Sequence, residues 1–406
     1  PPELPKALAI INPKLKDSSD YSVENLAGVG VAFKLAQAIY KTFLPEKMGQ
    51  LKWLLDLVAI GTVADMVPLI GENRILVKYG LLVLSKTRRI GLQELFKTGR
   101  IFIDESNVPD TQKISFQIAP RINSASRMSH AEDALKLLSE NNRVSARTMS
   151  LELENQNSRR QKETTQVSAE AEVIVKKSFL NKKFIFIAKE HFPIGTVGLV
   201  AGKIANKFNK PTAILKKGEV ESKGSFRSIP QINIIDLIEK TGDLLEAYGG
   251  HSQAAGITIK NENLKKFYEK LNRLIEEELE GKNLSPEIEI DQELKIEDID
   301  MCLVADLKKM EPFGQGNKEP IFVIRNLLVE DLKWLGNGEK HLKLFLRSAN
   351  TNNPNILEAI GFNLSGKFSD LKVGDEIDLV FNLSKDDWNG NEKIQMKIID
   401  LRLRNK

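Results

Sequence analysis

The sequence contains very little cysteine and no long hydrophobic run. Its 406 residues include one cysteine, Cys302, which excludes both a framework of internal disulfides and a multi-cysteine zinc site. No apolar stretch approaches the roughly 20 residues that a helix needs to cross a bilayer. No charged and then apolar signal segment opens the chain either. We therefore expect a protein of the reducing cytoplasm that has no contact with a membrane.

Neither sign of charge dominates the composition. The chain has 59 Lys and Arg residues against 55 Asp and Glu residues, which gives a formal net charge of +4. A balance this mild permits a local basic groove for nucleic acid but does not require one. The length predicts two or three domains.

Glycine and proline are absent from residues 121–192, although the whole chain has 26 glycines and 15 prolines. Long helices are expected there. "SHAE" (129–132) has the pattern of a capping box, with Ser129 as the cap and Glu132 three residues later. "ENN" (140–142) predicts a break, and the polar stretch 143–177, with its thin apolar stripe, is typical of an exposed helix that connects two domains.

Strand and helix signals alternate on both sides of this stretch, a pattern that is typical of α/β domains. On the N-terminal side, "KALAIINP" (6–13) predicts a short buried strand, and helices are expected over 28–43 and 51–61. On the C-terminal side, strands are expected over 183–190, 211–217, 224–228 and 254–260, and helices over 195–208, 233–248 and 263–281.

After residue 282 the pattern changes to short alternating runs separated by Gly, Asn and Asp turns. Such runs predict a small β-barrel of the OB type. Four aromatic residues of this region are candidates for stacking on nucleic-acid bases: Trp334, Phe345, Phe362 and Trp388. Each could equally be a core residue of the barrel, and alternation this short does not separate the two interpretations.

"YGGHSQAAG" (248–256) is the sharpest local motif. Gly249 and Gly250 would let backbone amides approach an anion closely, and His251 can donate to a phosphate or bind a metal. The alternative interpretation is a helix C-cap at the two glycines, followed by a surface histidine.

"KGSFRSIP" (223–230) places two hydroxyls and a guanidinium together, those of Ser225, Ser228 and Arg227. These groups are suited to bind phosphate oxygens. An ordinary exposed strand and turn would have the same composition.

"PRINSASRM" (120–128) supplies Arg121, Asn123 and Arg127 just before the expected connecting helices. They could line a substrate cleft, or they could tie a helix to its domain through ion pairs. Spacing alone leaves both open.

"LVAIGTVADMVPLIG" (57–71) contains one charged residue, Asp65, in a run whose other residues are typical of a buried hydrophobic core. An ionised carboxylate in such surroundings needs a partner. A backbone amide, a basic side chain or a metal ion would each serve, and a capping or backbone-bonded aspartate is the simplest interpretation.

Taken together and in order, the motifs resemble the RecJ family, the single-strand-specific exonucleases of the DHH phosphoesterase superfamily. The resemblance covers essentially the whole chain. It rests on "AIINPK", "LAGVGVAFKLAQAI", "LVAIGTVADMVPL", "PRINSASRM", "GSFRSI", "YGGHSQAAG" and "EPFGQGNKEPIF". It implies an α/β protein with the remainder of a DHH catalytic domain (1–128), connecting helices (129–179), a DHHA1 domain (180–282) and an OB-like nucleic-acid-binding barrel (283–406).

The resemblance also implies roles for the candidate residues. Asp65 corresponds to a metal-binding aspartate, and Arg227 and His251 would neutralise charge on the phosphoryl group that reacts. The remaining residues would contact the DNA or its phosphate in a cleft between the two α/β domains: Arg121, Asn123, Arg127, Ser225, Ser228, Gly249 and Gly250.

The activity implied is metal-dependent 5′-to-3′ hydrolysis of single-stranded DNA to mononucleotides, with a two-ion site of Mn²⁺ or Mg²⁺, in DNA repair and recombination. Single-stranded DNA, a single-strand-binding protein and a helicase are the implied partners, and we expect a monomer. The family's earlier metal motifs, including the DHH triplet, would precede Pro1, and the chain begins without methionine. We therefore expect this chain alone to be incomplete and inactive.

Two alternatives stay open at this point. One is a non-catalytic DNA-binding adaptor. The other is a DHH/DHHA1 phosphodiesterase that acts on oligonucleotides or cyclic dinucleotides, although the final β domain argues against it.

Overall fold

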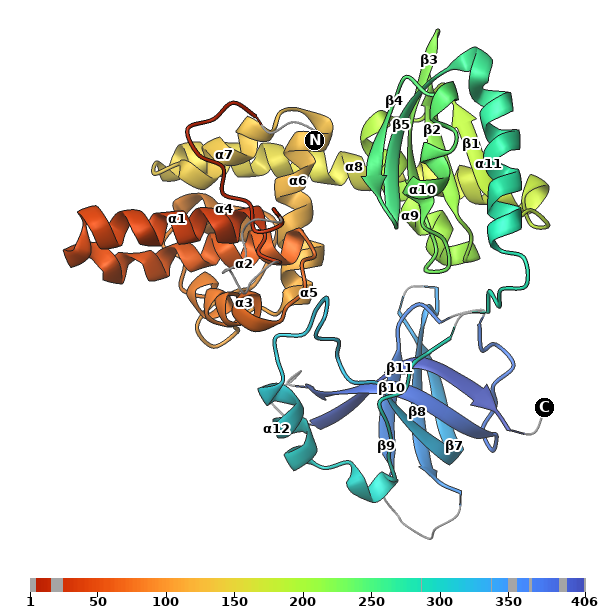
Figure 1. Cartoon of the computed structure of the whole chain (residues 1–406). Coiled ribbons are helices and arrows are strands. Elements are labelled where there is room, and N and C mark those ends of the chain that lie inside the picture. Colours follow the sequence, from red (N-terminus) through yellow and green to blue (C-terminus); the bar gives the residue numbers. More distant parts are fainter. Residues whose placement is uncertain are drawn as a thin grey trace. The chain divides into compact units, whose positions relative to one another are not determined.

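The computed structural model describes residues 5–15, 25–285, 287–336, 338–349, 356–364, 367–386 and 393–404. The chain divides into two compact units. Figure 1 labels their helices and strands. The first unit comprises Pro1–Ser85, Val108–Thr111 and Glu287–Lys406, and the second comprises Lys86–Asn107 and Gln112–Pro286. The boundaries predicted at residues 128, 179 and 282 are not tested by this division and stay predictions.

The first unit begins with a group of helices. These are α1 (Gly28–Phe43), a 3₁₀ helix (Pro45–Leu54), α2 (Leu55–Ala64) and α3 (Gly71–Leu84). Buried side chains from all of them share one small core: Leu26, Phe33, Leu51, Val58 and Leu76. Helices α2 and α3 pack closely because α3 has a glycine at their contact, where a Cβ on Gly80 would lie 2.5 Å from the Leu55 carbonyl oxygen.

The strand predicted over 6–13 is wrong, because residues 5–15 form no regular element. Leu8 is fully exposed there. A strand needs a neighbour for its backbone hydrogen bonds, and no strand lies among residues 5–85 that the structure describes.

The C-terminal part of the first unit is a β-barrel, as predicted. Around the barrel the strands run β7, β8, β9, β11 and β10, and β10 pairs again with β7. Only the β9–β11 pair is parallel within this ring, and such a closed five-stranded barrel is the OB architecture. The elements are β6 (Gln292–Glu293), a 3₁₀ helix (Ile296–Asp298), α12 (Met301–Lys309), β7 (Phe322–Leu335), β8 (His341–Ser348), β9 (Leu357–Gly361), β10 (Glu376–Asp386) and β11 (Lys393–Leu403).

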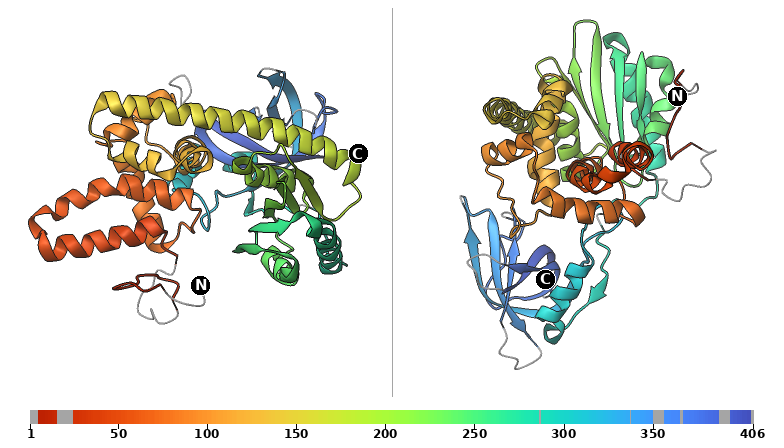
Figure 2. Two further views of the ribbon diagram at one scale, coloured as in Figure 1. Left: turned by 90° about the horizontal axis from the view of Figure 1, so that it is seen from above. Right: turned by 90° about the vertical axis from the view of Figure 1, so that its left-hand side faces the viewer.

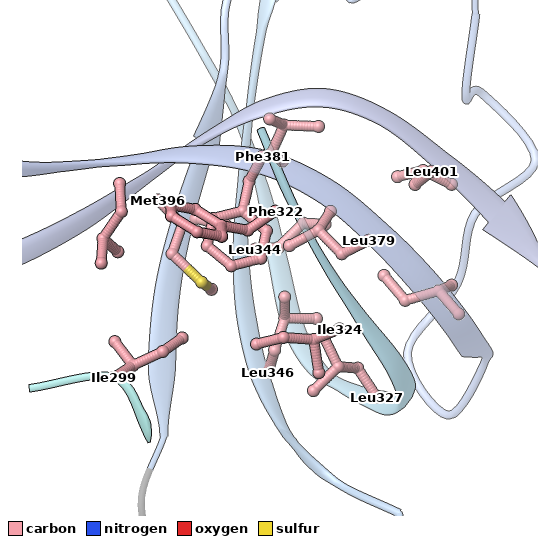
Figure 3. Close-up of a cluster of buried hydrophobic side chains, with 14 of the residues drawn as sticks. Ile299, Phe322, Ile324, Leu327, Leu344, Leu346, Leu379, Phe381, Met396 and Leu401 are labelled. Carbon is pink, nitrogen blue, oxygen red and sulfur yellow. The ribbon is translucent and has the colours of Figure 1, made fainter. Parts of the chain in front are cut away.

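Alternate side chains of these strands fill the barrel. Figure 3 shows Phe322, Leu344, Leu379, Phe381 and Met396 gathered in its centre, and all of them are buried. The period of two that suggested strands in the sequence is therefore the inward-facing set of the barrel.

The long helix expected within residues 121–192 is α8 (Arg143–Ser178), and the shorter helices α6 (Ala119–Met128) and α7 (Ala131–Ser139) precede it. Before them lie α4 (Ile90–Thr98), α5 (Thr111–Lys113, which spans the division between the units) and a π-helical turn (Ile114–Ile118). Figure 2 shows α8 as one uninterrupted helix. Among the described residues, no helix combines the length and the apolar character that crossing a membrane requires.

The break predicted at 140–142 is confirmed, and Asn142 caps α8 by accepting hydrogen bonds from the Val144 and Ser145 amides. The capping box predicted at 129–132 is wrong. His130 is the N-cap residue of α7, and the Ser129 hydroxyl donates to Asp133 at 2.6 Å instead.

A five-stranded mixed sheet completes the second unit, in the order β1-β2-β3-β5-β4. Helices α8 and α9 share a core with one face, and α10 and α11 share a core with the other. The elements are β1 (Ile185–Lys189), α9 (Ile194–Phe208), β2 (Thr212–Lys217), β3 (Glu221–Arg227), α10 (Ile234–Glu239), β4 (Ala247–His251), β5 (Ala254–Lys260) and α11 (Leu264–Glu278), with short 3₁₀ turns at Gly242–Leu244 and Asn261–Asn263.

The helix predicted over 233–248 is only half right. Helix α10 ends at Glu239, and residues from Ala247 form the strand β4, which pairs antiparallel with β5. Gly249 and Gly250 therefore lie in a strand, so the interpretation of these glycines as a helix C-cap is wrong.

The close contact of α2 with α3 predicts the effect of a small substitution. Gly80→Ala places a methyl group against the Leu55 carbonyl oxygen and the Ala59 Cβ, and we expect it to lower the free energy of unfolding of the first unit by about 1–3 kcal/mol. Gly49→Ala is the matched control, because a Cβ there meets nothing within 4 Å. Urea unfolding curves that show equal stability for the two variants would contradict this packing.

Candidate functional site

Asp65 lies at the end of α2, in the first unit. It is the C-cap residue, and its backbone amide donates to the Gly61 carbonyl oxygen at 3.0 Å. The side chain is exposed, although the surrounding apolar run predicted burial. Its carboxylate has no hydrogen bond or ion pair with any residue that the structure describes, so the backbone-bonded interpretation is not what is seen. A carboxylate at the negative end of a helix dipole is slightly unfavourable, and a bound cation would offset this cost.

The loop that follows Asp65 is held by the segment 310–317, which belongs to the same unit. The Leu69 amide donates to the Gln315 carbonyl oxygen at 2.6 Å, and the Asn73 side chain donates to the Pro68 carbonyl oxygen at 3.1 Å. A Cβ on Gly314 would lie 2.7 Å from Leu69. The glycines of "EPFGQGN" therefore let this segment pack directly against the loop and fix its course.

The described residues do not assemble a complete metal site. They contain no group of three or more His, Cys, Asp or Glu side chains placed to hold one ion. Mg²⁺ and Mn²⁺ take about six ligands, largely oxygen, so one exposed carboxylate does not fit a two-ion centre by itself. The two-ion site stays a prediction in which Asp65 would be one ligand among others.

In the second unit, the motifs of β3, β4 and β5 lie on one face of the sheet. The register places Arg227 opposite Ala254, and Ala254 opposite His251. One step along the same face, Gly256 lies between Ser225 and Gly249. Residues directly opposite in a sheet share a face, and the small residues of β5 leave room between the β3 side chains and His251.

Helix α9 approaches this face through its glycines. A Cβ on Gly198 would lie 3.2 Å from the Ser225 hydroxyl oxygen and 3.4 Å from an Arg227 guanidinium nitrogen, and a Cβ on Gly195 would lie 2.5 Å from the Arg127 carbonyl oxygen. The missing side chains therefore allow α9 to contact both the end of α6 and the basic end of β3.

Arg227 has only neutral hydrogen-bond partners within the described ranges. Its Nη1 donates to the Ser225 hydroxyl at 2.8 Å and to the Phe226 carbonyl oxygen at 2.7 Å. Burial lowers the pKa of Arg227, and the charge of the nearby Arg127 lowers this pKa further. A half-buried guanidinium that is influenced by a second cation, and that has no carboxylate partner among these residues, attracts an anion.

The other residues of the same motifs have different surroundings. The Arg121 guanidinium pairs with Glu154 at 2.5 Å and donates to the Gly99 carbonyl oxygen at 3.3 Å, which ties α6 to α8. The Ser228 hydroxyl donates to the Ile232 carbonyl oxygen at 2.9 Å. These two residues hold the frame of the site, whereas the Asn123 side chain is exposed.

The "GGH" residues lie at the β4–β5 turn. The His251 ring is exposed, and its Nδ1 accepts from the Gln253 amide at 3.3 Å. Nε2 is thus left for a ligand. A Cβ on Gly250 would lie 2.3 Å from the Ala254 carbonyl oxygen, so only glycine fits there, while a Cβ on Gly249 would meet nothing within 4 Å.

Two polar residues of α8, Asn157 and Arg160, were missed by the sequence analysis. Both are buried, at 1% and 9% exposure. A signal was available in the spacing, because the two positions fall on the same helical stripe as the buried residues Leu153, Thr164 and Val167. A charged residue on the buried stripe of an otherwise polar helix is informative.

The contact of α9 with β3 leads to a prediction about anion binding. Gly198→Ala crowds the Ser225 hydroxyl, which bonds the Arg227 guanidinium, and brings a methyl group to 3.4 Å from that guanidinium. We therefore expect a several-fold weaker affinity for a 5′-phosphorylated oligonucleotide, measured by fluorescence anisotropy, while the fold is retained. Gly202→Ala is the control on the same helix, because its Cβ would make an ordinary 3.9 Å contact with Arg227. Equal loss in both variants would mean that helix propensity or folding, and not the position of Arg227, is responsible.

Two segments of the chain match known domain families. Residues 181–277 match the DHHA1 domain, and residues 290–400 match the RecJ OB domain. The chain is 35% identical over 401 residues to the single-stranded-DNA-specific exonuclease RecJ of Bacillus subtilis, an alignment that covers 98% of this chain and 49% of that protein. It is 31% identical over 417 residues to RecJ of Salmonella typhimurium, covering 98% of this chain and 70% of that protein.

The fold agrees with that of a solved relative. The crystal structure of RecJ in complex with Mg²⁺ from Thermus thermophilus matches with a TM-score of 0.78 at 27% identity, covering 95% of this chain and 57% of that one. The complex of that protein with Mn²⁺ matches with a TM-score of 0.76 at 28% identity, covering 92% of this chain and 52% of that one. The chain spans about half the length of the Bacillus relative. The predicted fold class, α/β with a DHHA1 domain and a C-terminal OB-like barrel, is confirmed, and the chain belongs to the RecJ family of single-stranded-DNA-specific exonucleases.

Proposed function

We propose that this chain binds single-stranded DNA and contributes to a metal-dependent 5′-to-3′ exonuclease that releases mononucleotides. The observation that carries the proposal is the uncompensated basic surface of the second unit, in a chain of the RecJ family. Among the described residues, Arg227 forms hydrogen bonds with neutral groups only. The positive charge of Arg127 lowers the pKa of Arg227. Phosphate oxygens are the ligands that such a surface accepts in a nuclease.

Each residue of the site then has a role in binding or in charge neutralisation. Arg227, Arg127 and Ser225 donate hydrogen bonds to the phosphoryl oxygens, and His251 Nε2 donates to the same group from the far side of the small residues of β5. Gly249 and Gly250 let the DNA strand approach the backbone of β4, and Asn123 contacts the DNA from α6. Positively charged donors aimed at these oxygens stabilise the charge that develops as the phosphodiester is hydrolysed.

Asp65 is the proposed metal ligand of this chain. Its exposed carboxylate has no partner among the described residues, and relatives of this chain have been crystallised with Mg²⁺ and with Mn²⁺. Bound ions would supply an activated water and neutralise the leaving oxygen. The hydrogen bond from the Leu69 amide to the Gln315 carbonyl oxygen fixes the backbone of the loop that follows Asp65.

The OB barrel is the proposed binding site for the remainder of the single-stranded DNA. Phe345 lies on β8 between the inward-facing Leu344 and Leu346, so its ring is on the outer side of the strand. The ammonium groups of Lys333 and Lys343 lie 5.2 and 5.1 Å from its centroid. An aromatic ring flanked by lysines is suited to stack on a base and to bind the neighbouring phosphates, and this part of OB domains binds oligonucleotides.

Phe362 and Trp334 are weaker candidates for base stacking. Phe362 is 54% exposed and contacts the His341 ring, whereas Trp334 packs against the barrel core. Trp388 lies outside the described residues.

The wider setting follows from the same proposal. We place the protein in the cytoplasm, in DNA repair and recombination, as a monomer that works with a single-strand-binding protein and a helicase. A non-catalytic DNA-binding adaptor is the second candidate, because the described residues hold no group of three metal-ligating side chains. The OB barrel argues against a phosphodiesterase for oligonucleotides or cyclic dinucleotides.

Digestion of labelled single-stranded DNA with Mn²⁺ tests the proposed activity. We expect the complete open reading frame that contains this chain to release mononucleotides, and Asp65→Asn to reduce the rate by about 100-fold or more with little change in strand affinity. Asp306→Asn, on the exposed side of α12, is the control and keeps full activity. If the strand is bound but never cut, the adaptor function is correct.

The barrel surface has its own test. Phe345→Ala removes the proposed stacking platform, and we expect it to weaken binding of oligothymidylate by about 1–3 kcal/mol and to leave the slope of affinity against salt unchanged. Phe43→Ala is the control, since that ring is 74% exposed in the helical part of the same unit. If the Phe345→Ala variant binds oligothymidylate with unchanged affinity, the DNA does not pass over β8.

A further inference from the structure

Arg160 of α8 is a buried guanidinium whose hydrogen bonds are incomplete. The residue is 9% exposed, and its Nη2 donates to the Asn157 Oδ1 at 2.7 Å. Its Nε has no partner in the part of the chain that the structure describes, and neither has the Asn157 Nδ2. Both unpartnered atoms are hydrogen-bond donors, so the missing group is an acceptor.

The charge of Arg160 is also unmatched. No carboxylate within the described ranges forms an ion pair with it. Glu163, on the next turn, pairs through Oε1 with Arg159 at 2.8 Å, while its Oε2 has no partner among the described residues. Burial lowers the pKa of Arg160, and the charge of Arg127 lowers this pKa further. The same Arg127 lowers the pKa of the half-buried Arg227. Both arginines border the first turns of α9, because a Cβ on Gly195 would lie 2.5 Å from the Arg127 carbonyl oxygen and a Cβ on Gly198 would lie 3.4 Å from an Arg227 guanidinium nitrogen.

A buried cation without a counter-ion is costly. A trapped water could accept one hydrogen bond, but it would not compensate the charge. An anion with several oxygens would accept from both Arg160 and Asn157 and would neutralise the guanidinium. A phosphoryl group has these properties, because its oxygens accept hydrogen bonds in several directions.

We propose that Arg160 and Asn157 form, with Arg127, a phosphoryl-binding site that shares Arg127 with the Arg227 site. The inference deepens the proposed function and rests on it, since it extends the phosphate contacts from β3 to the connecting helix α8. The ligand is a phosphoryl group of a nucleic-acid strand or of a released mononucleotide.

Thermal unfolding of the 406-residue chain with and without inorganic phosphate tests the site. Phosphate raises the melting temperature of the unaltered chain. Arg160→Met removes a buried charge that has no counter-ion among the described residues, so this variant melts no earlier than the unaltered chain without phosphate and binds phosphate about tenfold or more weakly. Arg147→Met, an exposed position of the same helix, keeps the full response to phosphate.

Asn157→Asp is the second variant and keeps the proposal testable if Arg160→Met does not fold. The new carboxylate replaces the amide that already accepts from Arg160, so it provides an internal counter-ion at the same place. We expect this variant to melt higher without phosphate and to lose the response to phosphate. A folded Asn157→Asp variant that responds like the unaltered chain overturns the proposal.

Three ligands separate the two sources of the phosphoryl group: 5′-phosphorylated oligothymidylate, its 5′-hydroxyl form and thymidine 5′-monophosphate. If the site holds the phosphate at the end of a strand or of a released nucleotide, Arg160→Met weakens binding of the first and third ligands only. If it holds an internal phosphate, both oligonucleotides are weakened equally. Either result supports the site.

Arg227→Met distinguishes failure of this inference from failure of the proposed function. If Arg227→Met weakens binding and the Arg160 and Asn157 variants do not, the α8 site is wrong while the proposed function stands. If none of the three variants changes the affinity for any of these ligands, both are wrong.

Discussion

Positive charge without an internal counter-charge is the constraint on which the second unit depends. Two guanidiniums, Arg160 and Arg227, are wholly or partly removed from water, and the described residues offer them neutral oxygens only. The glycines of α9 and the small residues of β5 place few side-chain atoms beside Arg227. A chain selected for stability alone would place a carboxylate or an apolar residue there. The arrangement is consistent with a site that receives its counter-charge from the substrate.

In the first unit, Asp65 is a negative charge without an internal counter-charge among the described residues. This carboxylate follows the last turn of α2, without a basic partner in the described part of the chain, and its loop is fixed by the backbone of Gln315. A divalent cation would match the exposed aspartate of the first unit, and a phosphate would match the arginines of the second.

The sequence predicted most elements whose signal is local. The periodic apolar residues of α1, α8, α9 and α11 and the alternation of the barrel strands were sufficient, because these elements bury one stripe or one face each. The prediction of a helix through Tyr248 was wrong because β4 is stabilised by pairing with β5, a contact that local propensity does not report. Asp65 was expected in a core because the apolar run continues past the end of α2. Arg160 was missed because the polarity of α8 conceals its buried stripe.

The most direct measurement is a crystal structure of the 406-residue chain with 5′-phosphorylated oligothymidylate. The account predicts that phosphoryl oxygens contact the guanidiniums of Arg127, Arg160 and Arg227, with a base against the outer face of β8. It would be contradicted if the strand lay elsewhere on the second unit, or if the three guanidiniums had carboxylate partners from the chain itself.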